Sequence, residues 1–318
     1  MNYRSIKELS TLIAKKLYLI PHDVSIIIGI PRSGMLPASI ISLYLNKPLG
    51  SLETLLNKKT FNSGKTRETN LTRSSNQIKE NDVIFVVDDS IASGKSMREV
   101  KKTINELNIK NKVYFSAIYS APKVINNIDI FFEKVSMPRM FEWNLLHHPQ
   151  LKNASVDIDG VLCVDPLVSE NDDGRKYKDF LINAKPKYIP NHYIDNLVTS
   201  RLEKYRSETE EWLRKYSINY GNLIMLDLPN SKSRLRYGSG KYKAEIYKKN
   251  NSEIFIESDK SQAKTIAKIS GKPVICTDSQ EIFYGEFLSL QNINYQQRSL
   301  IKKILTKIKV TILKVMNK

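Results

Sequence analysis

The sequence has few cysteines and no long apolar run, and both absences narrow the class of protein. Only Cys163 and Cys276 occur in 318 residues, with no CxxC spacing and no Cys/His cluster. Neither a disulfide framework nor a zinc site is therefore expected, and a reducing, cytoplasmic location is favoured. No apolar run approaches the ~18 residues that a membrane-spanning helix needs. Charged residues interrupt the first seventeen positions, so these do not form a signal peptide.

Acidic residues are outnumbered by basic ones, 33 to 50, and the formal net charge is +17. Such an excess is typical of proteins that meet nucleic acid, anionic membranes or phosphorylated substrates. A second explanation is a composition generally rich in Lys, Asn and Ile. No nucleic-acid recognition motif accompanies the charge, so we expect no nucleic-acid partner.

The length and the order of apolar runs predict two α/β domains and a C-terminal helix. In the first half, strands are expected at 24–30, 83–87 and 113–120, and helices at 35–45 and 96–107. A second series of strands is expected at 154–158, 223–226, 254–256 and 274–277. The predicted domains are therefore residues 1–150 and 151–292, followed by a basic helix at 293–318.

Two adjacent acids end the strand that begins at Val83, and a turn of small residues then opens a helix. Asp88 and Asp89 are placed to accept hydrogen bonds from a sugar diol, while free N–H groups at the start of a helix suit a phosphate. The turn is not a nucleotide P-loop, because Asp89 stands where that motif needs glycine. The residues expected to hold the phosphate are Ala92, Ser93, Gly94, Lys95 and Ser96.

This segment resembles the phosphoribosyl pyrophosphate (PRPP) motif of type I phosphoribosyltransferases. The resemblance implies that Asp88 and Asp89 hold the ribose hydroxyls and that residues 92–96 hold the 5-phosphate. An earlier strand–loop–helix junction matches the family's pyrophosphate loop, with Arg32, Ser33 and Gly34 as expected ligands. The polar stretch 58–77 falls where the family has a flexible loop that closes over the reaction centre, and Lys65, Arg67 and Arg73 would supply its positive charge.

The acceptor is less clear from the first half. Ala92 stands where hypoxanthine-guanine members of the family carry an aspartate, which argues against that substrate class. Residues 137–144 can form part of an acceptor-binding hood. Trp143 either stacks there on a sugar or base, or belongs to the core.

In the second half, Asp157 and Asp159 follow an apolar strand two residues apart and therefore project to the same side. A first aspartate can attack phosphorus while a neighbouring acid protonates the leaving oxygen. The segment resembles the DxDGxL motif of the haloacid dehalogenase (HAD) superfamily, which implies a phosphatase with Asp157 as nucleophile and Asp159 as general acid/base. A calcium loop is the weaker alternative, because no ladder of acids follows.

The other superfamily motifs occur in the same order. The resemblance implies Thr199 as a phosphate ligand and Lys243, with Lys241 as the alternative, as the lysine that neutralises the phosphoryl group. Mg²⁺ would be held by Asp157 and Asp159 with Glu257 and Asp259, and the choice between the last two stays open. Residues 165–196 are too few for a large cap, so a HAD-like Rossmannoid domain with a small cap is expected.

The C-terminal segment 298–318 has seven basic residues, no acid and one apolar helical face. Such a helix can lie on an anionic membrane, which would make the protein peripheral on the inner face, or it can pack on the second domain.

Together the motifs resemble bifunctional ribofuranosyl-transfer proteins of bacterial surface polysaccharide synthesis. That resemblance implies transfer of 5-phosphoribose from PRPP to an acceptor hydroxyl, expected on a lipid-linked glycan, followed by hydrolysis of the 5-phosphate to leave β-ribofuranose. Two alternatives stay open: a nucleotide-salvage transferase fused to a nucleotidase, and a PRPP-sensing module that regulates the phosphatase. The sequence does not identify the acceptor, the transferase's general base or the oligomeric state.

Overall fold

The computed structural model describes residues 1–57, 59–62, 78–123 and 128–285. Contacts within the chain divide it into an N-terminal unit, Asn2–Trp143, and a C-terminal unit, Asn144–Lys318 with Met1. The division therefore follows Trp143, where the sequence predicted residue 150. Lys65, Arg67, Arg73 and the helix expected at 293–318 lie outside the described residues.

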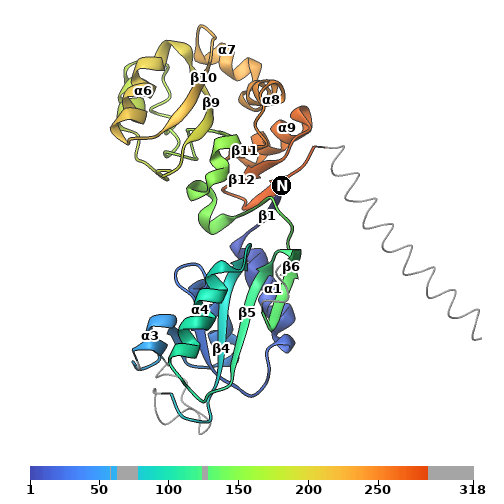
Figure 1. The fold of residues 1–318 in the computed structure, drawn as a ribbon. Coiled ribbons are helices and arrows are strands. Elements are labelled where there is room, and N and C mark those ends of the chain that lie inside the picture. The colour runs from blue at the N-terminus through green and yellow to red at the C-terminus, as the bar shows by residue number, and fades with distance from the viewer. Residues whose placement is uncertain (58, 63–77, 124–127, 286–318) are drawn as a thin grey trace, which may run out of the picture. The chain divides into compact units, whose positions relative to one another are not determined.

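The N-terminal unit is built on a five-stranded parallel sheet in the order β3-β2-β4-β5-β6 (Figure 1). Two further strands, β1 and β7, pair with each other in parallel. The bounds are β1 Asn2–Arg4, β2 Val24–Gly29, β3 Leu49–Ser51, β4 Val83–Ile91, β5 Val113–Ser120, β6 Ile130–Lys134 and β7 Arg139–Phe141.

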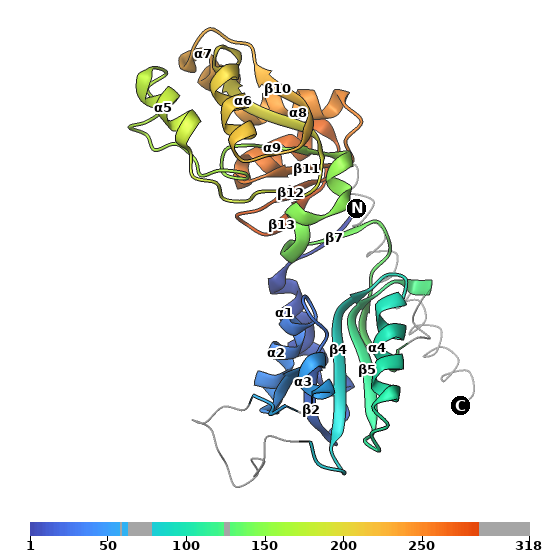
Figure 2. The ribbon, with the colours of Figure 1, turned by 60° about the vertical axis from the view of Figure 1, so that its left-hand side comes forward.

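Helices cover both faces of this sheet, which explains why its central strands are apolar on both sides. α4 packs on one face and α1 and α2 on the other (Figure 2). Alternate residues of β4 divide between the two cores: Ile84 and Val86 face α4, and Phe85 and Val87 face α1 and α2. The helices are α1 Ile6–Lys16, α2 Met35–Leu45, α3 Leu52–Leu56 and α4 Lys95–Glu106, with 3-10 turns η1 Leu17–Leu19 and η3 Glu142–His147.

The C-terminal unit has a six-stranded sheet in the order β10-β9-β8-β11-β12-β13, parallel except for the edge strand β13. Its central strand β8 lies between β9 and β11, so the three carboxyl ends meet at one edge. The strands are β8 Ala154–Val156, β9 Ile194–Leu202, β10 Tyr220–Leu226, β11 Ile254–Glu257, β12 Val274–Cys276 and β13 Glu281–Phe283.

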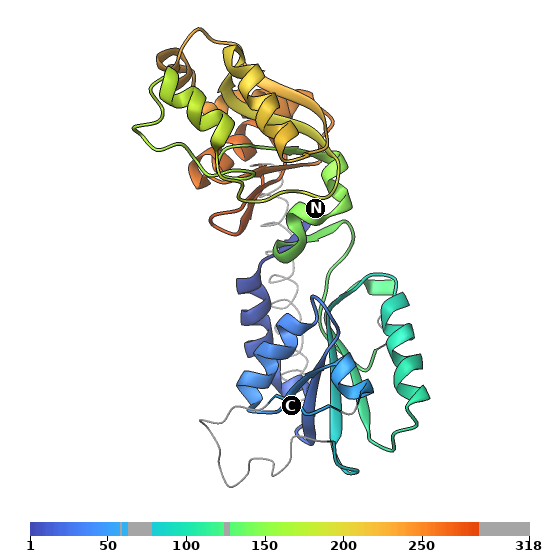
Figure 3. The ribbon, with the colours of Figure 1, turned by 90° about the vertical axis from the view of Figure 1, so that its left-hand side faces the viewer.

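Helices α8 and α9 pack on this sheet through one apolar cluster, and α5 and α6 lie side by side (Figures 2 and 3). The buried Trp212 of α6 donates its indole N–H to the carbonyl of Ala184, just beyond α5, at 2.7 Å. The bounds are α5 Arg175–Asn183, α6 Arg206–Lys215, α7 Ser231–Tyr237, α8 Ser239–Lys249 and α9 Lys260–Ser270, with 3-10 turns η4 Pro149–Asn153 and η5 Glu203–Tyr205.

The predicted α/β class with parallel sheets is confirmed. Each predicted strand and helix of the described residues is present, with ends displaced by a few residues. The strands β1, β3, β6, β7, β9 and β13 were not predicted. For β1, β3, β7 and β13 the reason is that three residues carry no recognisable periodicity. Within the described residues, no helix combines the length and apolar content needed to cross a bilayer.

Candidate active sites

The first site lies where two neighbouring strands of the N-terminal unit end. β2 leads into the loop Ile30–Gly34, and β4 carries Asp88 and Asp89. The loop is tied to β4 by the Ile30 N–H, which donates to the carbonyl of Val87 at 3.0 Å. A Cβ on Gly34 would lie 2.5 Å from the carbonyl oxygen of Ile30 and 2.9 Å from that of Val87. This close approach of backbone to backbone therefore requires glycine.

Asp89 is buried and both of its carboxylate oxygens accept hydrogen bonds. Ser33 donates its hydroxyl to one oxygen at 2.7 Å, and Trp143 donates its indole N–H to the other at 2.9 Å. Two of the residues predicted from the sequence, Ser33 and Asp89, are thereby brought together across β2 and β4. The orientation of Asp89 is set by neutral donors on both sides.

Trp143 is the residue of this site whose role the sequence left open. Its ring stacks on Phe141 with centroids 4.8 Å apart, and Tyr119 and Phe141 stack in turn at 5.4 Å. Stacking and the indole hydrogen bond therefore fix Trp143 beside the acidic pair. The only sequence signal for this role was that Trp143 follows Phe141 by two residues. That spacing does not identify Asp89 as the hydrogen-bond partner of Trp143.

Asp88 shares the site, and no basic side chain of the described residues is paired with it. Its carboxylate accepts the N–H of Asp89 at 2.8 Å. Burial, together with the neighbouring charge of Asp89, raises the pKa of Asp88 from 3.8 to about 8. The side chain therefore carries a proton at neutral pH in the absence of a ligand.

The predicted phosphate loop lies at the start of α4. Gly94, at the N-cap, offers no side chain to the first amide groups of the helix. Ser93 accepts the N–H of Lys95 at 3.3 Å, and Ala92, Ser93, Lys95 and Ser96 are exposed. Exposed N–H groups and hydroxyls at a helix N-terminus suit a phosphate. Arg32 is likewise exposed in its loop.

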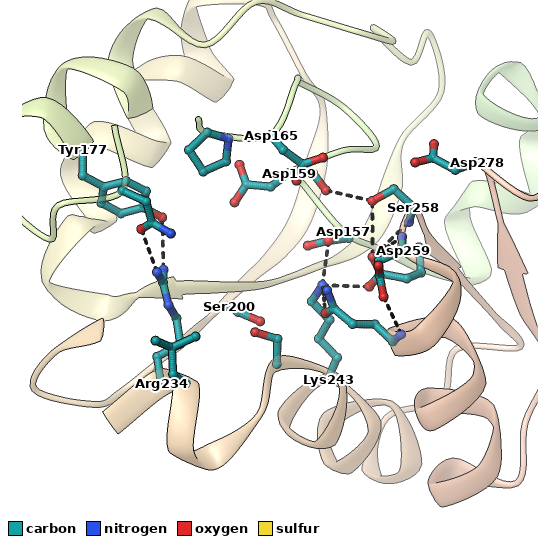
Figure 4. A pocket seen from close by; sticks show the side chains of 16 residues that line it. Asp157, Asp159, Asp165, Tyr177, Ser200, Arg234, Lys243, Ser258, Asp259 and Asp278 are labelled. Atoms are coloured by element: carbon teal, nitrogen blue, oxygen red, sulfur yellow. Dashed lines mark hydrogen bonds and ion pairs between the residues drawn. The ribbon is translucent and has the colours of Figure 1, made fainter. Parts of the chain in front are cut away.

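The second site lies at the carboxyl edge of the C-terminal sheet, where β8, β9 and β11 end. Lys243 of α8 is buried and donates to Asp157 at 2.6 Å and to Glu257 at 2.7 Å (Figure 4). The alternative, Lys241, is exposed and its ammonium group lies over the Tyr237 ring. Lys243 is thus the lysine that occupies the site.

Charges in this cluster are unevenly compensated. Burial raises the pKa of Asp157 well above its ordinary value, against the attraction of Lys243, and the charge of Glu257 raises it further. One oxygen of Asp157, Oδ1, is buried with no hydrogen-bond partner among the described residues. A buried carboxylate oxygen without a partner is costly, so this atom is the one of the cluster that is left without a donor among the described residues.

Asp159 is held by Arg201, a residue that the sequence analysis did not single out. The fully buried guanidinium donates to both carboxylate oxygens, with Nη2 2.7 Å from Oδ1 and Nε 3.1 Å from Oδ2. Burial alone would raise the pKa of Asp159, but Arg201 outweighs it and holds the pKa below its ordinary value. An arginine inside the strand β9, directly after Thr199 and Ser200, was the available signal.

The predicted phosphate ligand Thr199 is fully buried, and its hydroxyl accepts the N–H of Arg201 at 3.2 Å. The adjacent Ser200 lines the cavity of the site instead, and its buried hydroxyl has no hydrogen-bond partner among the described residues. Alternation along β9 turns neighbouring side chains to opposite sides, so the structure brings Ser200 rather than Thr199 to the cavity.

Gly160 makes the tight turn between Asp159 and the cap. Its φ is +75°, and a Cβ there would lie 2.1 Å from the hydroxyl of Ser258. The loop after it and α5 cover this edge of the sheet, where the sequence predicts a small cap. Beneath them is a cavity of about 360 Å³, within the usual range for small-molecule sites.

The predicted Mg²⁺ ligands do not gather as a metal centre. Glu257 accepts the N–H groups of Ser258 and Asp259 in addition to Lys243. Asp159 is engaged by Arg201, and Asp259 caps α9 by accepting the N–H of Gln262. Within the described ranges, no group of three or more His, Cys, Asp or Glu side chains is arranged to hold a metal. This donor set does not fit Mg²⁺ as it stands, and the steps below use none in the second site.

The fold and the first site define the N-terminal unit as a parallel α/β domain with an acidic pair and a helix N-terminus at one edge of its sheet. The model of the phosphoribosyl transferase domain family matches residues 2–143. The N-terminal unit is therefore a phosphoribosyl transferase domain of type I, as the sequence motifs predicted. No curated protein matches the chain in sequence.

Solved structures resemble the chain over the same part. Xanthine-guanine-hypoxanthine phosphoribosyltransferase of Helicobacter pylori is 17% identical and covers 45% of this chain and 92% of its own, with a TM-score of 0.33. A purine phosphoribosyltransferase of Pyrococcus horikoshii is 17% identical and covers 45% and 94%, with a TM-score of 0.32. These scores are too low to support an argument about the acceptor, and the assignment of the domain depends on the family model.

Replacement of Asp88 by asparagine should stabilise the protein at alkaline pH. The native state keeps a proton on Asp88 that the unfolded chain loses above about pH 4, so wild-type stability falls between pH 4 and about pH 8. Asparagine does not ionise, so it removes this loss of stability with rising pH. Its amide oxygen can still accept the hydrogen bond from the Asp89 N–H. We expect the melting temperature of Asp88→Asn to exceed that of wild type at pH 8.5 and to equal it near pH 3.5. An equal difference at both pH values would show that folding does not raise the pKa of Asp88.

Replacement of Trp143 by phenylalanine keeps a ring that can stack on Phe141 and removes the indole donor. Because a hydrogen bond to a charged group contributes about 1.5–3 kcal/mol, we expect PRPP affinity, measured calorimetrically with Mg²⁺, to fall roughly tenfold or more. Trp212→Phe, in the other unit, is the matched control. Unchanged PRPP affinity combined with lost use of the acceptor would instead place Trp143 in the acceptor site.

Removal of the Lys243 charge should destabilise the C-terminal unit. Lys243→Ala leaves two carboxylates buried side by side, a change that typically costs about 3–5 kcal/mol. The loss should be smaller at low pH, where both acids are protonated. Urea unfolding of the full chain measures it, and Lys241→Ala, on the exposed side of α8, should change stability by less than about 0.5 kcal/mol. Similar unfolding of the two variants would contradict the buried ion cluster.

Proposed function

We propose that the chain transfers 5-phosphoribose from PRPP to an acceptor hydroxyl and then removes the 5-phosphate, leaving a β-ribofuranosyl unit. The observation that carries the second activity is the buried cluster of Lys243, Asp157 and Glu257, in which one oxygen of Asp157 lacks a partner. The first activity is supported by the phosphoribosyl transferase domain at residues 2–143.

In the transfer step, Asp88 and Asp89 hold the ribose hydroxyls of PRPP and residues 92–96 hold its 5-phosphate. The loop with Arg32, Ser33 and Gly34 faces the pyrophosphate, whose negative charge Mg²⁺ and the basic residues Lys65 and Arg67 would balance. The acceptor oxygen forms a bond to C1 of the ribose as the C1–pyrophosphate bond breaks. The acceptor hydroxyl gives up its proton to the departing pyrophosphate, and inversion at C1 yields a β-linked product.

In the hydrolytic step, Asp157 Oδ1 attacks the phosphorus of the 5-phosphate and the bond to the sugar oxygen breaks, giving an aspartyl phosphate. Lys243 and the hydroxyl of Ser200 are placed to stabilise the phosphoryl oxygens. Water then hydrolyses the aspartyl phosphate and releases inorganic phosphate. The ionised Asp159, held by Arg201, can accept the proton of that water. Asp159 can protonate the leaving sugar oxygen only after Arg201 releases it.

The acceptor that we propose is a sugar of a lipid-linked glycan in surface polysaccharide synthesis. A glycan hydroxyl accounts for the pairing of the two activities, because removal of the 5-phosphate turns a phosphoribosyl group into a plain ribofuranose and makes the transfer irreversible. The basic segment 298–318 would bring a cytoplasmic protein to the inner face of the membrane, where such acceptors lie.

Product analysis by mass spectrometry tests both activities at once. Wild type and Asp157→Asn are incubated with PRPP, Mg²⁺ and a lipid-linked glycan, with free nucleobases in parallel reactions. We expect a glycan heavier by one ribose from the wild type and a glycan heavier by one phosphoribose from Asp157→Asn. The Asp88→Asn/Asp89→Asn double variant should form neither.

Two results would contradict the proposal. Products on nucleobases but not on glycan would identify a salvage enzyme. Identical glycan products from wild type and Asp157→Asn would remove the phosphatase step. Phosphate release measured with and without EDTA tests separately whether the hydrolytic step needs the Mg²⁺ that the sequence motifs predict, although the donor set found at the second site does not fit that ion.

A further inference from the structure

The cavity of the C-terminal unit has a second end, opposite the cluster of Lys243, Asp157 and Glu257. Asn171, Tyr177 and Arg234 form this wall, which comes from the cap loop, α5 and α7 (Figure 4). None of these residues takes part in the chemistry described above. A phosphomonoester whose phosphorus lies at Asp157 would direct its alcohol portion into the remaining space.

Arg234 is a cation without a carboxylate partner. Its Nη2 donates to the side-chain oxygen of Asn171 at 2.8 Å, and its Nη1 donates to the hydroxyl of Tyr177 at 3.4 Å. No ion pair of Arg234 occurs among the described residues, whereas Arg201 and Arg206 of the same unit are both paired with acids. A guanidinium group has five donors, so Arg234 retains donors for a ligand while neutral oxygens fix its orientation.

The chemistry of the cavity indicates which alcohol would fit. Pro166 and Leu235 are the only aliphatic residues among those that line it, and Asp165 adds a carboxylate near the cap. Tyr177 is only 2% exposed and packs against Phe180 and Tyr205. Its ring therefore offers no free face on which a nucleobase could stack. Neighbouring donor and acceptor groups of this kind are suited to sugar hydroxyls.

We propose that Arg234, oriented by Asn171, binds hydroxyl groups of the sugar alcohol released from the phosphomonoester, and thereby selects sugar phosphates over esters of apolar alcohols. The inference depends on the proposed phosphatase activity and adds the class of its leaving group.

Steady-state phosphate release from ribose 5-phosphate and from phenyl phosphate tests the inference. Phenyl phosphate has the same reacting group but no hydroxyls on its alcohol. For Arg234→Ala we expect kcat/KM for ribose 5-phosphate to fall roughly 10- to 100-fold, mainly through KM, as for the loss of hydrogen bonds from a charged donor. The value for phenyl phosphate should change less than about threefold. Asn171→Ala should show the same selectivity with a smaller loss.

Two controls separate binding from folding. Arg236→Ala, exposed two residues further along α7 and not part of the cavity wall, should match wild type on both substrates. Arg234→Lys keeps the cation and most of the packing, and should retain more activity on ribose 5-phosphate than Arg234→Ala.

Each other outcome has a definite meaning. Equal losses on both substrates, or no loss on either, would overturn the assignment of Arg234. A larger loss on ribose 1,5-bisphosphate than on ribose 5-phosphate would also overturn it, because Arg234 would then bind an anion. If wild type releases no phosphate that depends on Asp157 from either substrate, the proposed phosphatase itself fails, and the inference fails with it.

Discussion

Acidic side chains brought together in a buried place repel each other and lose hydration, so each must find a donor, a cation or a proton. Both sites of this chain place acids at the carboxyl edge of a parallel sheet, where neighbouring strands bring them close. In the C-terminal unit the compensation is cationic, through Lys243 and Arg201. In the N-terminal unit it comes from the neutral donors Ser33 and Trp143. The way each pair is compensated determines what the site can bind.

Because only neutral donors, Ser33 and Trp143, contact Asp89 in the first site, the negative charge there can still attract a ligand that carries a positive charge or hydrogen-bond donors. Asp89 is held in place, while Asp88 keeps a proton that a diol or a cation can displace. Under the proposed function, cationic compensation suits the second site to a phosphoryl group, because Lys243 is paired with the carboxylate proposed to attack it. The same residue type, at the same edge of the same kind of sheet, would then serve two different ligands.

Much of this arrangement could be predicted from the chain alone, because strand ends and the polar residues that follow them are local features. Asp88, Asp89 and Asp157 were found in this way. The choice of Lys243 over Lys241 depends on the phase of α8, which buries Tyr242, Lys243 and Ala244 and leaves Lys241 exposed. Contacts between distant segments could not be predicted: Trp143 reaches Asp89 across 54 positions, and Arg201 reaches Asp159 across 42. The structure separates the roles of Glu257 and Asp259, between which the sequence could not choose. Glu257 contacts Lys243, whereas Asp259 caps the start of α9.

Under the proposed function, the phosphatase faces a difficulty, since PRPP itself carries a 5-phosphate and must not be consumed before transfer. The cavity wall offers a physical solution. Its lining includes six acids, namely Asp157, Asp159, Asp165, Glu257, Asp259 and Asp278, and two cations, Lys243 and Arg234. Two further cations outside the lining pair with these acids: Arg201 with Asp159 and Lys187 with Asp278.

PRPP adds a pyrophosphate to its 5-phosphate, whereas the transferred phosphoribosyl group carries one phosphate on an otherwise neutral sugar. In a partly desolvated cavity, additional negative charge is unfavourable near carboxylates that outnumber their cationic partners. The excess of acids therefore disfavours the donor more than the product, and a wall that binds hydroxyls through Arg234 favours the product further. Charge at the second site can thus impose the order of the two reactions without any contact between the two units.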